Sequence, residues 1–85
     1  MNPTKSTERS PYCPEARQYA TDLLGHLGKS GGTIPGSFTA KVFELWAVAD
    51  MTNKFIIASS WPFIAVALHA NDYGGEAAVR SVAGI

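Results

Sequence analysis

The sequence feature that most constrains the fold is an almost uncharged stretch from Lys41 to Asn71. Only four residues in this stretch carry a formal charge, yet both tryptophans and three of the four phenylalanines of the chain lie within it. Because burial of apolar surface is the main driving force of folding, we expect this stretch to form the core.

The length of 85 residues corresponds to one small domain. A domain of this size buries only about 60 to 65 percent of the surface that its unfolded chain exposes, so a partner subunit would add to its stability. Residues 1–10 contain no apolar residue after Met1 and are predicted to form a disordered tail. Residues 11–85 are expected to form a single small domain.

Composition excludes several classes of partner. Seven basic and seven acidic residues cancel without a run of one sign, which argues against direct binding of nucleic acid. The longest uncharged run considered, Phe55 to Ala70, has sixteen residues. A spanning helix needs ~20 apolar residues, so no membrane is expected. With Cys13 as the single cysteine, no internal disulfide can form, and the cytoplasm is the expected location.

A first helix is predicted from Pro14 to Leu27. Pro14 suits the first turn of a helix, and Gly28 can adopt the left-handed conformation that ends one. The segment 29–37 contains three glycines and a proline and is expected to be a flexible loop. The apolar residues of the helix recur at the spacing of one helical face: Ala16, Tyr19, Ala20, Leu23, Leu24 and Leu27.

The first half of the apolar stretch, Val42 to Ala49, fits two templates. Read as a strand, it alternates between two faces; its β-branched and aromatic residues favour this interpretation. The segment 50–53 then makes a turn before a second strand, Lys54 to Ser59, and together they predict an antiparallel β-hairpin. Read as a helix, the same segment places these residues on one face: Val42, Leu45, Trp46 and Ala49.

The expected hairpin is apolar on both faces. Pairing Ala49 with Lys54 places Trp46 opposite Ile57, and neither face then carries a polar surface. A hairpin in a monomer usually exposes one side to water, so either helices cover both faces or one face contacts another chain.

Two further helices are predicted after the hairpin. The first begins at Pro62, where a proline is tolerated in the first turn, and ends near Ala70. The second, Glu76 to Ala83, ends at Gly84. The predicted fold class is therefore α+β, with an N-terminal helix, an antiparallel β-hairpin and two helices (α-β-β-α-α). A mostly α fold is the alternative.

Catalytic and metal signatures are weak. Cys13, His26 and His69 could form a thiol–imidazole pair, but a structural zinc needs four ligands at close spacing. The tripeptide at 28–30 copies the end of a phosphate-binding loop, yet Leu23 replaces the glycine that this motif needs. The sequence predicts a protein that is not an enzyme and has no cofactor or metal.

Aromatic residues are the stronger functional signal, because tryptophan, tyrosine and phenylalanine dominate the energetics of interfaces. The alternative is that all of the aromatic residues among the candidates belong to the core. The candidate partner-binding residues are Glu44, Trp46, Phe55, Trp61, His69 and Tyr73.

The segments 46–50 and 54–58, followed by Pro62 and Ala65, Leu68 and Asn71, resemble a pattern in small phage and prophage proteins. Those proteins have a short hairpin with an aspartate turn and then a helix that starts with proline. The resemblance covers about a third of the chain. It implies an origin in a mobile element, and such proteins are often inhibitors that bind a host protein, anti-CRISPR proteins among them. No functional residue is implied.

The sequence thus predicts a small non-enzymatic protein-binding module, expected to act as a phage-encoded, anti-CRISPR-like inhibitor that sterically occludes a host defence complex. Its expected partner is a host protein or protein complex. One alternative is a homo-oligomeric accessory subunit of a larger assembly, for which a homodimer is the simplest form. Another is a small enzyme that uses Cys13 and a histidine.

Overall fold

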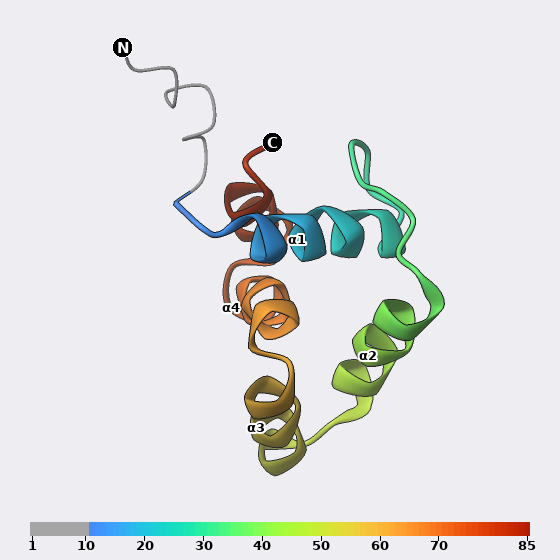
Figure 1. The fold of residues 1–85 in the computed structure, drawn as a ribbon, viewed down its shortest axis with the longest axis vertical. Helices are drawn as coiled ribbons and strands as arrows, with labels where there is room; N and C mark the ends of the chain where they lie inside the picture. The colour runs from blue at the N-terminus through green and yellow to red at the C-terminus, as the bar shows by residue number, and fades with distance from the viewer. Residues whose placement is uncertain (1–10) are drawn as a thin grey trace.

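The computed structural model describes residues 11–85. The regular structure in this part of the chain is helical (Figure 1), and none of these residues forms a strand. The predicted α+β class, with its α-β-β-α-α order, is therefore wrong, and the fold is all-α. The predicted disordered tail, residues 1–10, lies outside the described residues. The helices are α1 (Pro14–His26), α2 (Ser37–Val48), α3 (Met51–Ser60) and α4 (Pro62–Ala83).

Helix α2 replaces the first predicted strand because its apolar side chains meet the core on one helical face. Val42, Phe43 and Trp46 are all buried, while Glu44 and Leu45 between them are exposed. A strand would send Val42 and Phe43 to opposite faces, whereas a helix places positions i, i+1 and i+4 on the same side. Packing against the other helices thus outweighs the strand propensity of the individual residues.

The predicted hairpin turn is the start of α3. Asp50 is the N-cap residue of this helix, and its Oδ1 accepts a hydrogen bond of 2.8 Å from the backbone N–H of Asn53. An aspartate that bonds the backbone a few residues onward occurs in turns and at helix starts alike. The second predicted strand, Lys54 to Ser59, is consequently part of a helix that buries only Ile57.

Helix α4 contains both of the last predicted helices. It begins at Pro62 and is closed by Gly84, which has a left-handed φ of 80°. The break between the two halves lies at Gly75 alone, with φ 65° and ψ −157°, a conformation that is essentially restricted to glycine. The residues before Gly75 continue the first half of the helix, so positions 71–73 belong to a helix and not to a loop.

The core forms mainly where α1 lies across α4 (Figure 1). Leu24 of α1 and Val79 of α4 are the largest side chains with almost no exposed surface. Helix α2 adds Trp46 to this core, and α3 adds Ile57. Helices α2 and α3 meet at the end of the molecule that is far from α1.

The glycine-rich segment after α1 returns over that helix. The Thr33 N–H donates to the Thr21 carbonyl oxygen over 3.1 Å. A Cβ atom on Gly32 would lie 2.1 Å from the backbone nitrogen of Gly25, so the two backbones approach as closely as glycine allows. The segment that was expected to be a flexible loop is thus bonded to a helix.

The described chain begins and ends beside α1, at the opposite end of the long axis from the α2–α3 junction (Figure 1). Between residues 11 and 85, no helix combines the length and the apolar character required to cross a membrane.

Candidate functional site

Asp72 of α4 joins three helices through one carboxylate. Its Oδ2 accepts a hydrogen bond of 2.9 Å from the indole Nε1–H of Trp46 on α2, and one of 2.8 Å from Nζ of Lys54 on α3. The Lys54 Nζ also lies 5.1 Å from the centroid of the Trp46 ring, within cation–π range. Because a buried indole N–H needs an acceptor, Asp72 fixes how α2 and α3 sit against α4.

His69 and Tyr73 extend this cluster along α4. The His69 ring lies edge-on to Trp46, with centroids 4.9 Å apart and planes at 86°. The His69 ring also stacks on the ring of Tyr73, one helical turn onward, with ring centroids 6.0 Å apart and ring planes at 17°. The structure therefore brings together three of the predicted candidates, and we call Trp46, Lys54, His69, Asp72 and Tyr73 the Asp72 cluster.

Phe55 lies at a small hollow next to the Asp72 cluster. The hollow has a volume of about 140 Å³ and lies between α3 and α4. The charged side chains in its lining, Lys54 and Asp72, are paired with each other, so the hollow presents aromatic and aliphatic surface without a free charge. Its lining residues are Met51, Lys54, Phe55, Ala58, His69, Asp72 and Tyr73.

Glu44 lies at a different hollow, between α2 and the C-terminal part of α1. This hollow has a volume of about 390 Å³ and includes Phe43, Trp46 and Leu68 in its lining. The exposed Glu44 carboxylate lies 3.5 Å from Nζ of Lys41 on its own helix. Glu44 therefore does not line the hollow beside Phe55, although it is only two residues from Trp46.

Trp61 is separate from the other candidates. It is half-buried at the start of α4, and its ring lies edge-on to Phe38 with centroids 5.5 Å apart. Trp61 borders a third hollow of about 290 Å³ between α2 and α3, which has no ionisable side chain in its lining. We call this hollow the α2–α3 groove; its lining residues are Leu45, Val48, Ala49, Asn53, Ile56, Ile57, Ser60 and Trp61.

Large apolar side chains are exposed on both sides of α3: Leu45, Val48 and Ile56 line the α2–α3 groove, whereas Met51 and Phe55 line the hollow between α3 and α4. Val48 is 82% exposed, Phe55 72% and Met51 71%, and Leu45 and Ile56 are each at least half exposed. We call these five residues, which lie on consecutive helices, the apolar end. Sequence analysis anticipated that the apolar stretch would supply both core and interface, but only Phe55 of these five was a candidate.

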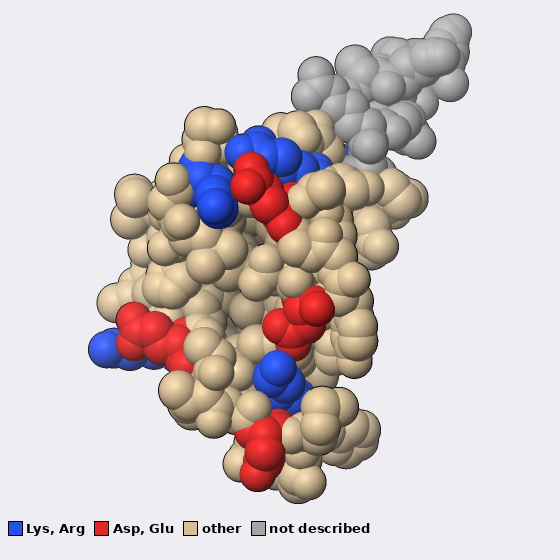
Figure 2. Space-filling view, turned by 180° about the vertical axis from the view of Figure 1, so that it is seen from behind, with Lys and Arg blue, Asp and Glu red and all other residues tan. Residues whose placement is uncertain are grey.

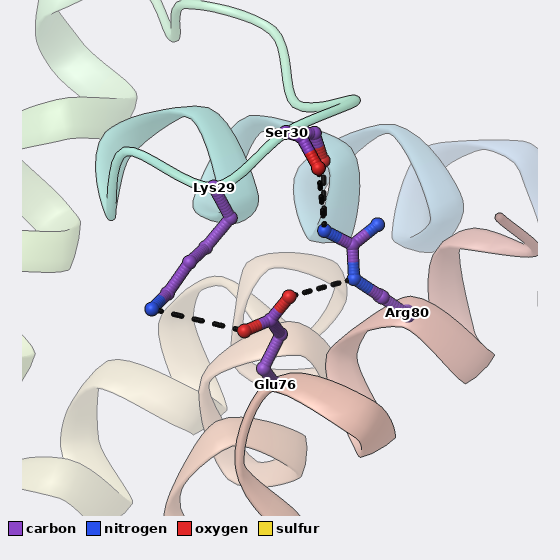
Figure 3. Close-up of polar contacts among 4 residues, drawn as sticks. All are labelled: Lys29, Ser30, Glu76 and Arg80. Atoms are coloured by element: carbon purple, nitrogen blue, oxygen red, sulfur yellow. Dashed lines mark hydrogen bonds and ion pairs between the residues drawn. The ribbon is translucent and has the colours of Figure 1, made fainter.

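A second polar cluster holds the glycine-rich loop to α4 (Figure 3). Arg80 donates from Nε to Glu76 over 2.8 Å and from Nη2 to the Ser30 carbonyl oxygen over 2.8 Å. Lys29 Nζ lies 3.7 Å from the other Glu76 oxygen. The Arg80 hydrogen bond, helped by the charges of Arg80 and Lys29, holds the pKa of Glu76 below its ordinary value, because these contacts outweigh the opposing effect of burial.

The residues that resembled a phosphate-binding loop have structural partners here. Lys29 contacts Glu76, and Ser30 accepts hydrogen bonds from Arg80. Charges of opposite sign are neighbours on the wider surface as well. On the face in Figure 2, Lys and Arg side chains lie next to Asp and Glu side chains, and no large patch carries charge of one sign. This arrangement gives no strong attraction for a polyanion.

The possible catalytic residues are not assembled. Cys13 and His26 stand at opposite ends of α1. A rise of 1.5 Å per residue separates them by about 20 Å, which is beyond the reach of a proton transfer. His69 contacts Trp46 and Tyr73. In the part of the chain that the structure describes, no three His, Cys, Asp or Glu residues are grouped closely enough to hold a metal ion.

Comparisons with known proteins give one match and no family. No family model matches the chain, and no solved structure matches it. A very-long-chain 3-oxoacyl-CoA reductase from Mycosarcoma maydis is 29% identical over 79 residues. The match includes 93% of this chain but only 21% of the reductase, so the chain spans about a fifth of that protein's length.

Sequence reasoning missed Lys54 and Asp72, the two charged members of the Asp72 cluster. Lys54 was placed on a strand, and the helix that begins at Pro62 was expected to end near Ala70, before Asp72. A usable signal was nevertheless present: a buried Trp needs an acceptor for its N–H, and few carboxylates lie near the apolar stretch.

Proposed function

We propose that this chain is a small protein-binding module that docks a partner through the apolar end. The observation that carries the proposal is the exposure of Leu45, Val48 and Ile56, which lie on two consecutive helices and line one uncharged groove. Soluble monomers rarely expose contiguous apolar surface on this scale, and such surfaces mark interaction sites. Burying them against a partner would release water from apolar surface that this fold leaves uncovered.

Charge favours a protein over a lipid surface as the partner. Helices that bind membranes in the interfacial plane carry Lys and Arg on their polar faces. Here the two lysines nearest the apolar end are already paired, Lys41 with Glu44 at 3.5 Å and Lys54 with Asp72 at 2.8 Å. The acidic side chain of Asp50 lies between α2 and α3, which disfavours anionic lipid further.

The proposal keeps the expectation of a protein that is not an enzyme. The polar groups of the Asp72 cluster bond one another, and the separation of Cys13 from His26 leaves the thiol without that imidazole as a base. A Cys13→Ser variant should therefore bind its partner as the wild type does. An activity that disappears with this substitution would contradict this part of the proposal.

The finer expectation concerns the identity of the partner. A phage-type inhibitor would use the apolar end to cover a working surface of a host defence complex, so that occlusion alone would block the complex. The resemblance to small phage proteins supports this expectation only weakly, because part of its pattern was a hairpin and these residues form helices. It remains a prediction.

The proposal is tested by placing a photo-crosslinking amino acid at Val48 in the full chain inside cells. The matched control places the same amino acid at Ala77, an exposed position on the second half of α4. We expect protein adducts from Val48 and none from Ala77, and a second substitution, Ile56→Glu, should abolish the Val48 adducts while circular dichroism stays unchanged. Equal crosslinking from both positions, or none from either, would overturn the proposal.

A second candidate function follows from the match to the reductase. If this chain corresponds to a part of such an enzyme, the apolar groove between α2 and α3 would contact the acyl portion of a very-long-chain 3-oxoacyl-CoA. Titration of that compound should then change the fluorescence of Trp61, which borders the groove, and coenzyme A without an acyl chain is the control. A Trp61→Phe variant identifies the responding tryptophan. An unchanged spectrum would remove this candidate.

A further inference from the structure

We propose that the hollow beside Glu44 is a binding site for a small aromatic amine. Side chains of α1, α2 and α4 line this hollow, Leu23, Trp46 and Asp72 among them, and we call it the three-helix hollow. Among residues 11–85, Val48 is the only one that lines both this hollow and the α2–α3 groove. The site is thus separate from the docking function proposed above and does not depend on it.

The three-helix hollow has the size and the walls of a small-molecule site. Its volume of about 390 Å³ lies within the range of ligand pockets, roughly 300 to 1,000 Å³. Leu23, Phe43, Trp46 and Leu68 form its inner wall, and each is buried as part of the core. Because the core holds these side chains in place, little ordering is needed when a ligand enters.

The walls of the three-helix hollow favour an aromatic ligand. Phe43 and Trp46 of α2 contribute their rings, and the ring of His26 from α1 lies 5.3 Å from that of Phe43 with planes at 56°. Aromatic rings pack edge-on or offset against one another and gain more than buried area alone provides. The Trp46 N–H is already bonded to Asp72, so the indole offers the ligand its ring surface and no free donor.

The charge inside the three-helix hollow is negative. Glu44 and Asp72 both line it, and no Lys or Arg among residues 11–85 does. Lys41 contacts Glu44 from outside the lining, at 3.5 Å and with both side chains exposed, and such a pair contributes little. Lys54 and Trp46 both bond Oδ2 of Asp72, and within residues 11–85 its Oδ1 has no hydrogen-bond donor. The hollow therefore favours a cation.

Asn71 adds a second hydrogen-bond acceptor next to Asp72. It also lines the three-helix hollow, and within residues 11–85 its side-chain amide forms no hydrogen bond. An ammonium group has three N–H donors and no acceptor, so it can bond both Oδ1 of Asp72 and the side-chain oxygen of Asn71. An acid with the same aromatic body would instead meet two carboxylates. The hollow thus selects the amine over the acid by attraction and by repulsion together.

The test compares three compounds with one aromatic body: phenylbutylamine, phenylbutanol and phenylbutyrate. A protein of 9.1 kDa suits NMR titration, and its two tryptophans provide an internal control. We expect phenylbutylamine to shift the indole N–H signal of Trp46, which lines the hollow, and to leave that of Trp61 unchanged. Its dissociation constant should be on the order of 1 mM, with weaker binding of the alcohol and the weakest of the acid.

Three variants of the full chain locate the ligand. Ala47 is exposed and lines the hollow, so Ala47→Phe should weaken amine binding by about tenfold or more because the added ring occupies the ligand's space. Ala77→Phe adds the same ring at an exposed position outside the lining and should bind as the wild type does. Glu44→Gln should weaken amine binding by about twofold to fivefold, as expected for one exposed charge, and should not weaken binding of the alcohol.

Each result decides one part of the proposal. Equal affinity for the amine, the alcohol and the acid would overturn the selection of a cation. Amine binding that Ala47→Phe leaves unchanged, or the absence of any Trp46 shift with all three compounds, would overturn the site itself. None of these measurements involves a partner protein, so the docking function can fail while this site stands, and the reverse also holds.

Discussion

The indole nitrogen of Trp46 and the Oδ2 atom of Asp72 lie 2.9 Å apart, although 26 positions separate the two residues in the sequence. This bond crosses from α2 to α4, and Lys54 of α3 shares the same oxygen at 2.8 Å. One carboxylate thus determines the mutual placement of the two helices that form the apolar end. The predicted interaction surface depends on this contact although Asp72 is not part of that surface.

Asp72→Ala should destabilise the fold by about 1–3 kcal/mol, because it leaves the buried Trp46 N–H without an acceptor. The matched variant Asp72→Asn keeps an oxygen for the indole and removes only the charge facing Lys54, so its loss should be smaller. Denaturant midpoints of the three proteins measure the difference. Equal stability of the alanine and asparagine variants would show that the Trp46–Asp72 hydrogen bond contributes little.

Gly32→Ala should destabilise the protein by about 1–3 kcal/mol, the usual cost of forcing extra atoms into a packed site. The added Cβ would meet the backbone of Gly25 at 2.1 Å, and backbone cannot rotate away as a side chain does. Gly36→Ala is the control, since Gly36 has φ −67° and open space around it. Gly36 is the N-cap residue of α2, where alanine is less favourable, and this cost opposes the gain of about 0.4–1 kcal/mol from a less flexible unfolded chain, so the net change should be small. Melting temperatures of Gly32→Ala and Gly36→Ala compare the two variants. A similar loss of stability in both would contradict the close approach of the Gly32 and Gly25 backbones.

Gly75→Ala should cost about 1–3 kcal/mol, because φ 65° with ψ −157° lies in a region that other residues avoid. Gly75 has no neighbouring atom within 4 Å of an added Cβ, so the cost comes from the backbone and not from crowding. The unfolding free energy measures the loss. A stability equal to that of the wild type would mean that α4 can straighten through this position without disturbing the packing of Val79.

Glu76→Gln should lower stability at neutral pH and have progressively less effect in acid. The pKa of Glu76 in the folded protein is below its ordinary value because Arg80 and Lys29 favour the charged form. A carboxyl with a lowered folded pKa stabilises the protein above its unfolded pKa of about 4.3, and this contribution disappears as the pH falls through the folded value.

Melting temperatures of wild type and Glu76→Gln between neutral and acid pH test the predicted direction of this pH dependence. The two curves should converge as Glu76 becomes protonated. Glu44→Gln removes another exposed carboxylate, whose contact with Lys41 is 3.5 Å, and serves as the control. A gap between the wild-type and Glu76→Gln curves that widens in acid would contradict the arrangement in Figure 3.

Sequence analysis located α1 correctly because every signal there agrees. Its apolar residues repeat with the helical period, Pro14 marks the start and Gly28 follows the end, and the observed helix stops one residue before the prediction, at His26. The start of α4 at Pro62 and its closure by Gly84 were found by the same local rules. These signals depend on backbone preferences that act within a few residues.

The error over α2 and α3 has a physical cause. Helical periodicity is visible when exposed positions are polar, but here Leu45, Val48, Phe55 and Ile56 are exposed and apolar. Their presence removes the contrast between the two faces, so β-branched and aromatic residues suggested strands. The feature that concealed the helices is therefore the same one that marks the candidate binding surface.

The candidate site was predictable only in part. Aromatic residues were chosen by type, and the structure brings Trp46, His69 and Tyr73 together as neighbours, with Phe55 at the adjoining hollow. Glu44 and Trp61 lie elsewhere. The pairing of Lys54 with Asp72 depends on how three helices cross, which no local pattern encodes.

The location of both ends of the described chain beside α1 has a practical consequence. A fluorescent protein, an affinity tag or a surface tether attached through either end would extend from the side opposite the α2–α3 junction. The chain could therefore be immobilised on a sensor, or carried as a fusion, with Val48 and its neighbours still facing solution.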